Sequence, residues 1–317
     1  AEKGGRGGVE LELHQRGKEA VNSQARSPGR VSVLLSRRVT CVQANNEGVT
    51  VMCEWRKWSS GPFGEGGVNE KESNLEEEMH HADLAVCTLP VGVLKSGDVI
   101  FRPPLSESQA AAINRTGSGA HNKVILRFAP KDIFWPQAVR NFNCLDPCIQ
   151  FLNLDAYGKK GVLVAHIWPP YAFKFGGESD EKVKDKVLSV LQTMFRNLTG
   201  AKIPDPVDFI VTRWDTDPFS LGSYSFASRR SRRLDPVQMS QPHPSWNPRV
   251  YFAGEATSIL GSQCVYGAVE SGRRAVREIV SAECDNTKID RIVEAFRREP
   301  DFGKETECDV LARALTK

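Results

Sequence analysis

The fold is decided by a strand, a loop and a helix near the end of the sequence: Val250-Tyr251-Phe252-Ala253-Gly254-Glu255-Ala256-Thr257, then Val265-Tyr266-Gly267-Ala268-Val269-Glu270-Ser271-Gly272. The apolar run predicts a buried strand that enters a loop at Gly254, and the composition of 264–281 predicts a helix. A glycine there lets the backbone approach a bulky ligand, and Glu255 can accept hydrogen bonds from sugar-like hydroxyls. The helix would direct its first amides at an electron-rich group. The pattern predicts a ligand site, with a generic packing unit as the alternative.

A second buried strand is predicted upstream, over 82–90. Its short apolar run ends in Thr88 and Pro90, which is typical of a parallel strand that finishes at a ligand crevice. Further strands are expected at 31–35, 39–42, 49–55, 122–128, 162–168 and 209–214, and helices at 106–116 and 181–198. The polar stretch 56–81 is expected to be a solvated insertion. This irregular mixture predicts an α/β (α+β) fold.

Composition excludes several classes of protein. The 317 residues are 40% hydrophobic and 26% charged, as in a globular protein, and no window approaches 18 consecutive apolar residues. The net charge of +3 is too small to indicate a nucleic-acid binder. The basic run 229–233 is interpreted as a solvated loop, with nucleic-acid binding or nuclear import as the alternative. We therefore expect no membrane span and no direct nucleic-acid motif.

The cysteines and histidines do not form a metal site. The eight cysteines are scattered, so reduced buried thiols are expected. Cys144 and Cys148 lack a second pair or nearby histidines, and the six histidines do not cluster. We predict no metal.

Two more constellations carry chemistry. One is His121-Asn122-Lys123-Val124-Ile125-Leu126-Arg127-Phe128, followed by Phe134-Trp135. The other is Arg213-Trp214-Asp215-Thr216-Asp217-Pro218-Phe219-Ser220-Leu221-Gly222-Ser223-Tyr224-Ser225-Phe226. With the two strand segments above, these blocks occur in the order found in the flavin-containing amine oxidase family, across about residues 30–282, and the chain resembles that family. Their joint occurrence is more specific than any one block.

The resemblance implies a partial flavin amine oxidase fold: the remainder of an FAD-binding domain plus a mixed-sheet substrate domain. It implies that FAD is the cofactor and that Lys123 holds a water beside the flavin N5, although a lysine chosen at random would more often be an exposed strand-edge residue. Aromatic walls suit an amine, because rings tolerate residual positive charge. The implied cofactor contacts are Val39, Thr88, Trp214, Gly254, Glu255, Cys264 and Val265. The implied substrate contacts are Tyr224, Phe219 and Cys264.

Within that family, the block Trp-x-x-Asp-Pro-x-x-x-Gly-Ser-Tyr-Ser is most similar to the lysine-specific histone demethylases, and the polyamine oxidases come second. Cys264 replaces the second aromatic wall of many amine oxidases, as a small residue does in the demethylases. Against that, the demethylases' long helical insertion is not visible here. The resemblance implies oxidative C–N cleavage of a methyl-lysine peptide or a polyamine with release of hydrogen peroxide. It also implies chromatin or corepressor partners and a nuclear location, with the cytoplasm as the alternative. A third possibility is an inactive fragment that serves as an interaction module.

Enzymes of the resembled family usually begin with a glycine-rich phosphate-binding unit, and this sequence contains no such unit. The nearest match to Gly-x-Gly-x-x-Gly, Gly117-Ser118-Gly119, has Asn122 at the last position and does not open a helix after a buried strand. We therefore expect a fragment of a longer chain that binds FAD poorly by itself. The expected domains are an N-terminal remnant (1–29), FAD-binding parts (30–97 and 247–283), a substrate-binding domain (98–246) and a helical tail (284–317).

Overall fold

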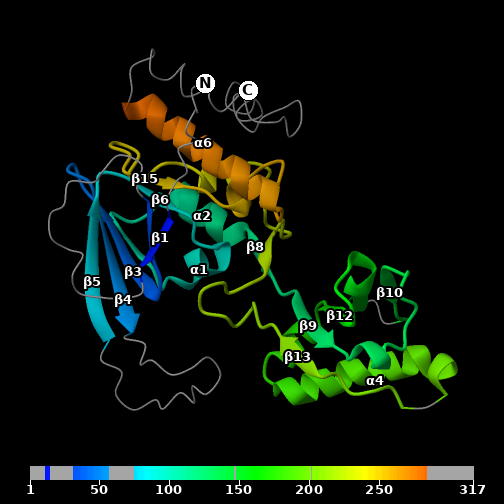
Figure 1. The fold of residues 1–317 in the computed structure, drawn as a ribbon. Helices are drawn as coiled ribbons and strands as arrows, with labels where there is room; N and C mark the ends of the chain where they lie inside the picture. Colours follow the sequence, from blue (N-terminus) through cyan, green and yellow to red (C-terminus); the bar gives the residue numbers. More distant parts are fainter. Residues whose placement is uncertain (1–10, 15–30, 57–74, 146–147, 201, 284–317) are drawn as a thin grey trace, which may run out of the picture. The chain divides into compact units, whose positions relative to one another are not determined.

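The computed structural model describes residues 11–14, 31–56, 75–145, 148–200 and 202–283 (Figure 1). The expected helical tail and most of the N-terminal remnant lie outside these residues. The chain divides into two compact units. The first comprises residues 1–83 with 99–103, and the second comprises 84–98 with 104–317. Each unit is described by itself. None of the helices in the described residues is long and apolar enough to cross a membrane.

The first unit is built on a four-stranded sheet in the order β5-β4-β3-β7, with a separate parallel pair β1-β2. The strands are β1 (Leu11–His14), β2 (Val31–Leu34), β3 (Arg37–Ala44), β4 (Val49–Arg56), β5 (Leu75–Ala82) and β7 (Ile100–Arg102). β3 pairs antiparallel with β4, and β4 pairs antiparallel with β5.

The strand β5 corrects one expectation, because it occupies the last part of the stretch predicted to be a solvated insertion. Its sequence is mostly polar, which hides the strand from a hydrophobicity pattern. β5 is an edge strand of the sheet, where charged side chains are common because they discourage pairing with other chains. One of them, Glu78, accepts a hydrogen bond of 2.9 Å from Arg37 Nε on β3.

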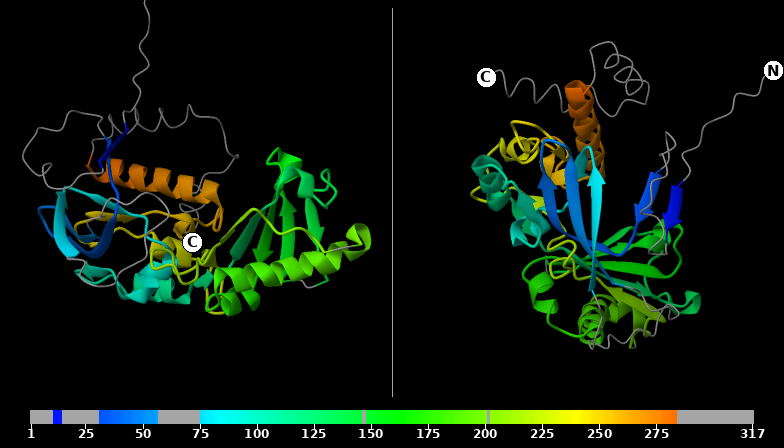
Figure 2. Two further views of the ribbon diagram at one scale, coloured as in Figure 1. Left: turned by 60° about the horizontal axis from the view of Figure 1, so that its bottom comes forward. Right: turned by 90° about the vertical axis from the view of Figure 1, so that its left-hand side faces the viewer.

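The second unit contains a five-stranded sheet in the order β10-β11-β12-β9-β13. Its strands are β9 (Asn122–Arg127), β10 (Asn141–Asn143), β11 (Ile149–Asn153), β12 (Val162–Ile167) and β13 (Asp208–Val211). All four described pairings are antiparallel, a more uniform pattern than the mixed sheet expected from the sequence. Figure 2 shows α4 (Asp180–Thr199) running along this sheet.

Alternation along the strands gives this sheet two unlike faces. On one face, Val124 and Leu126 of β9 join Leu163 and Ala165 of β12 in the core beneath α4. The helix contributes its buried apolar side chains Val183, Val187, Leu188, Leu191 and Phe195. The opposite face carries the intervening residues of β9 and β12, which are largely polar or only partly buried.

The other part of the second unit is the strand–loop–helix of residues 250–283. β15 (Val250–Phe252) pairs parallel with β6 (Ala85–Cys87), so the predicted parallel pairing type is confirmed. α6 (Val265–Glu283) packs Ala275 against Tyr251 and Ala253. The fully buried Arg274 of α6 donates to the Phe252 carbonyl at 2.8 Å, which fixes the helix to the strand.

The remaining elements of the second unit complete the scaffold. They are α1 (Val91–Ser96), α2 (Glu107–Arg115), α3 (Tyr171–Phe175), α5 (Asp235–Met239), β8 (Gly117–Gly119), β14 (Tyr224–Phe226) and the short 3-10 helices η1 (Pro130–Asp132), η2 (Leu154–Tyr157) and η3 (Glu255–Thr257). β8 and β14 form an antiparallel pair. The predicted helices at 106–116, 181–198 and 264–281 are confirmed as α2, α4 and α6.

Candidate active site

Asn122 joins the aromatic segment 213–226 to strand β9. Its side chain is buried, its Oδ1 accepts a hydrogen bond of 2.8 Å from the Trp214 backbone N–H, and its Nδ2 donates to Asp215 Oδ1 at 2.7 Å. Next to it, the Lys123 backbone N–H donates to Thr212 Oγ1 at 2.7 Å. Two stretches that are distant in sequence are therefore fixed side by side at the start of β9.

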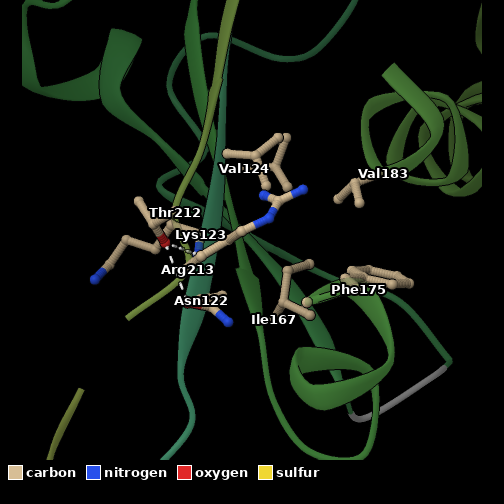
Figure 3. A pocket seen from close by; sticks show the side chains of 10 residues that line it. Asn122, Lys123, Val124, Ile167, Phe175, Val183, Thr212 and Arg213 are labelled. Atoms are coloured by element: carbon tan, nitrogen blue, oxygen red, sulfur yellow. Dashed lines mark hydrogen bonds between the residues drawn. The ribbon is translucent and has the colours of Figure 1, made fainter. Parts of the chain in front are cut away.

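Lys123 lies on the sheet face away from α4. Figure 3 shows its side chain extending away from Phe175 and Val183, whereas the Arg213 side chain reaches toward Val183. A small pocket in this region, which Lys123 also lines, measures about 10 Å³, room for about one water molecule, and is too small for a flavin. The Lys123 side chain therefore lies on the open face of the sheet, the face that α4 does not cover.

A cluster of rings lies on that same face. His166 is the cross-strand partner of Lys123. His166 Nδ1 and His121 Nε2 are hydrogen-bonded at 2.9 Å. The His121 ring stacks on Trp168 with 3.7 Å between centroids and meets Tyr224 edge-on at 6.0 Å. The structure thus brings Tyr224 and Lys123, two of the residues singled out in the sequence, into one neighbourhood through the two histidines.

Burial and nearby positive charge keep both imidazoles neutral. Desolvation, then the charges of Lys123 and His166, lower the pKa of His121 to about 4. Desolvation, then Lys123, lowers the pKa of His166. Burial also raises the pKa of Tyr224, so its hydroxyl stays protonated. Two neutral imidazoles that share one hydrogen bond always present one donor and one acceptor at their outer nitrogens.

His121 is expected to make the fold sensitive to acid. Because its folded-state pKa of about 4 is below the ordinary 6.5, the unfolded chain binds this proton first as the pH falls. The stabilisation is complete above about pH 6.5 and is lost as the pH falls toward 4, by on the order of 1 kcal/mol after allowance for partial exposure. Urea unfolding at about pH 7 and 4.5 should show a smaller loss of stability in His121→Gln than in the unaltered chain. Equal losses in both would contradict this assignment.

The carboxylate of Glu255 is largely occupied by protein donors. It accepts from the Ser225 backbone N–H at 2.9 Å, the Ser225 hydroxyl at 2.8 Å and the Gln263 backbone N–H at 2.5 Å. A carboxylate has about four acceptor positions, so about one remains for a ligand. Glu255 thereby ties β14, which carries Tyr224, to the loop that precedes α6.

The loop before α6 and the backbone at Gly254 leave room for a large group. Gly254 has φ +128°, and a Cβ built there would meet no heavy atom within 4 Å, so a bulky ligand can approach the backbone. Val265 begins α6 and is 82% exposed, and Trp214 is 40% exposed. The first turn of a helix also leaves amides without intrahelical acceptors. At this loop, the open backbone of Gly254, the exposed Val265 and the first turn of α6 fit a flat heterocycle such as a flavin.

The other residues singled out in the sequence lie at different places. Phe219 is 62% exposed, in a turn closed by the Asp217 side chain. Cys264 is exposed and directly precedes α6. Thr88 is exposed after β6. Val39 belongs to the first unit, where it pairs with Cys53 beside a β-bulge.

The expectation for the cysteines holds in part. The six cysteines in the described residues form no disulfide with one another, but only Cys41, Cys53 and Cys87 are buried, and Cys264 is exposed. Among the described residues, no group of three or more His, Cys, Asp or Glu side chains is placed to hold a metal ion.

Comparison with known proteins decides the family. Residues 3–280 match the family model described as flavin containing amine oxidoreductase. The chain belongs to this family. The cofactor of the flavin-containing amine oxidoreductases is FAD. The fold is also similar to that of cyclohexylamine oxidase from Brevibacterium oxydans, with a TM-score of 0.56 and 19% sequence identity over 79% of this chain and 49% of that one.

Curated relatives of this chain include proteins named lysine-specific histone demethylase homolog and a polyamine oxidase. Lysine-specific histone demethylase 1 homolog 2 of Oryza sativa subsp. japonica is 30% identical over 80% of this chain, and the Arabidopsis thaliana protein of the same name is 32% identical over 69%. Polyamine oxidase 5 of Oryza sativa subsp. japonica is 37% identical over 64%. The chain spans only 30%, 29% and 38% of the length of these relatives, respectively.

Sequence reasoning missed His121, His166 and Trp168. The sequence did contain a signal for part of the cluster. His121 lies two residues before Lys123, and His166 lies two residues before Trp168. Residues two apart on an extended strand share a face, so each pair could be expected on one face. The register that sets His166 opposite Lys123 is a long-range property that the pattern of either strand alone does not reveal.

Proposed function

We propose that this chain forms part of an FAD-dependent amine oxidase that cleaves a C–N bond oxidatively, with release of hydrogen peroxide, and that its substrate is a methylated lysine in a peptide. The observation that carries the proposal is the grouping of Lys123, Tyr224 and the neutral histidine pair on one open sheet face. The bound flavin would supply the acceptor for two electrons and a proton from the carbon next to nitrogen; molecular oxygen would take them up as hydrogen peroxide, and water would hydrolyse the resulting imine and so break the C–N bond.

The chain's own residues bind and orient the amine. Tyr224, held by its strand pairing with Gly119, forms a wall against which a neutral amine stacks. Lys123 holds a water molecule near the reacting carbon. The positive charge of Lys123 disfavours a second cation close by and so favours the uncharged form of the amine, which is the form that is oxidised. No protein nucleophile is needed for this chemistry.

The methyl-lysine assignment rests on two features. Cys264 is a small and exposed side chain, and the family resemblance assigns it the position of a second aromatic wall, where a small residue would leave room for a peptide-borne side chain. Several relatives are named lysine-specific histone demethylase homologs. By extension we propose a nuclear location and chromatin or corepressor partners. A polyamine substrate is the second candidate, supported by the 37% identity with polyamine oxidase 5.

The decisive experiment measures peroxide release by the protein expressed from the complete gene. A methyl-lysine histone peptide is offered in one arm and spermine in the other, and formaldehyde is measured in the peptide arm. We expect peroxide and formaldehyde in equal amounts with the peptide and a much slower reaction with spermine. Faster turnover of spermine would establish a polyamine oxidase instead. Bound FAD without turnover of either substrate would overturn the proposal in favour of an inactive interaction module.

A further inference from the structure

The loop 227–234 carries a compact group of positive charges that the amine oxidase chemistry does not use. Its four arginines, Arg229, Arg230, Arg232 and Arg233, are all exposed. Among the residues that the structure describes, none of their guanidinium groups has a hydrogen bond or an ion pair with a side chain or a carbonyl. Such groups are ordinarily mobile and well solvated, and by themselves they indicate nothing more than a polar surface.

The backbone of this loop, however, is tightly held. The hydroxyls of Ser228 and Ser231 both donate to the Arg115 carbonyl, at 2.6 and 3.0 Å. The Arg232 backbone N–H donates to Asp235 Oδ2 at 2.7 Å. Asp235 is buried and is itself held by the Arg115 guanidinium at 2.5 Å. Asp235, the acidic residue nearest to the loop in sequence, is therefore already paired with Arg115 and does not neutralise the loop arginines. The hydrogen bonds to Ser228, Ser231 and Arg232 fix the backbone that carries these arginines.

The positive field extends to α1. Lys95, in the last turn of that helix, has its pKa lowered by burial and then by the charge of Arg230. Burial is the larger cause, and the smaller contribution of Arg230 means that the two positive charges are close enough to repel each other. The loop therefore lies beside an additional basic group rather than an acidic one.

We propose that the loop 227–234 binds the phosphate backbone of double-stranded DNA without reading its sequence. Guanidinium groups form paired hydrogen bonds with phosphate oxygens, and a rigid loop loses little conformational entropy on binding. The proposal is independent of the amine oxidase activity, since no residue of the loop contacts the ring cluster around Lys123.

The composition of the loop favours a phosphate backbone over an acidic protein surface. Protein interfaces usually have an apolar or aromatic centre, whereas the loop consists of alanine, serine and arginine with one larger apolar residue, Leu234, at its end. Single-stranded nucleic acid is also disfavoured, because its binding depends on aromatic side chains on which bases stack. A basic loop without rings fits a duplex, whose exposed phosphates are densely spaced.

The test is a fluorescence anisotropy titration of the full chain against a labelled 20-base-pair duplex at several salt concentrations. Four neutralised phosphates give a log–log salt slope of about −3.6, so the affinity should fall about a hundredfold between 50 and 200 mM salt. Replacing all four arginines with glutamine should abolish measurable binding at the lower salt. Two unrelated duplex sequences should bind equally well.

A matched control variant distinguishes DNA binding by the loop from DNA binding that depends only on the overall charge. The variant Lys131→Gln/Lys159→Gln/Lys160→Gln/Lys182→Gln removes the same charge from other exposed positions of the second unit and should bind DNA nearly as well as the unaltered chain. Equal losses in the two quadruple variants would overturn the proposal, since binding would then follow net charge alone. Preferential capture of a polyglutamate peptide over the duplex would overturn it in favour of an acidic protein partner. All variants should unfold at the same urea concentration, because none of these side chains is buried.

Discussion

Replacing Gly267 with alanine is expected to lower the free energy of unfolding by roughly 2–3 kcal/mol and to weaken FAD retention. A Cβ at Gly267 would lie 1.9 Å from the Gly261 carbonyl oxygen and 2.7 Å from the Gly261 Cα. These are backbone atoms, so the first turn of α6 or the loop before it has to move. The loop resists, because the buried Ser258 hydroxyl accepts from the Gly261 N–H at 2.9 Å and Glu255 holds Gln263.

The matched control lies in the same helix. A Cβ at Gly272 would meet nothing within 4 Å, and alanine is favoured over glycine in a helix interior by about 1 kcal/mol. Gly272→Ala should therefore leave stability unchanged or raise it slightly. Urea unfolding of both variants checks the pair, and FAD content after gel filtration checks the cofactor. If Gly267→Ala proved as stable as the Gly272 variant, the close contact between α6 and its preceding loop would be refuted.

Replacing Lys123 with methionine is expected to lower the maximal rate of amine oxidation by about a hundredfold, the size of loss that misplacement of a reacting group can cause, because the water molecule is no longer held, with little change in KM. Methionine keeps most of the side-chain length but removes the ammonium. Stability should hardly change, because among the described residues the Lys123 ammonium makes no hydrogen bond or ion pair.

A second measurement separates a direct role of Lys123 from a structural one. Its charge helps to lower the pKa of His121, so that pKa should rise in Lys123→Met, as followed by NMR titration of the imidazole protons. Lys123→Arg keeps the charge and should leave the His121 pKa near 4 while still impairing the reaction, because a guanidinium presents its donors differently. An unaltered His121 pKa in Lys123→Met would show that the two side chains are not neighbours.

Much of the second unit could be predicted from local patterns. The apolar periodicity of 181–198 predicted α4, and the run before Gly254 predicted β15, because both segments bury the residues that define their period. β5 was missed for the complementary reason: an edge strand with glutamates and histidines lacks the alternation by which a strand is identified.

The candidate site could be predicted only in its parts. Lys123, Tyr224 and Glu255 were identified by motif, but the contacts that connect them involve residues with no distinctive pattern. Asn122 joins β9 to Trp214, and Ser225 joins β14 to Glu255. Which hydroxyl or amide meets which carboxylate depends on the register of distant strands, and that register is fixed by packing across the whole unit rather than by any single stretch.

The parallel pairing of β6 with β15 has a consequence for the order of events during synthesis. Val250 pairs with Ala85, and the entire antiparallel sheet lies between them in the chain. After β6 has left the ribosome, the edge of β6 that pairs with β15 stays exposed until β15 has also been synthesised. The meander β10-β11-β12 uses short connections and can assemble earlier. The sheet under α4 should therefore resist proteases in nascent chains that stop before Val250, whereas the segment around β6 should become protected only after α6 has been translated.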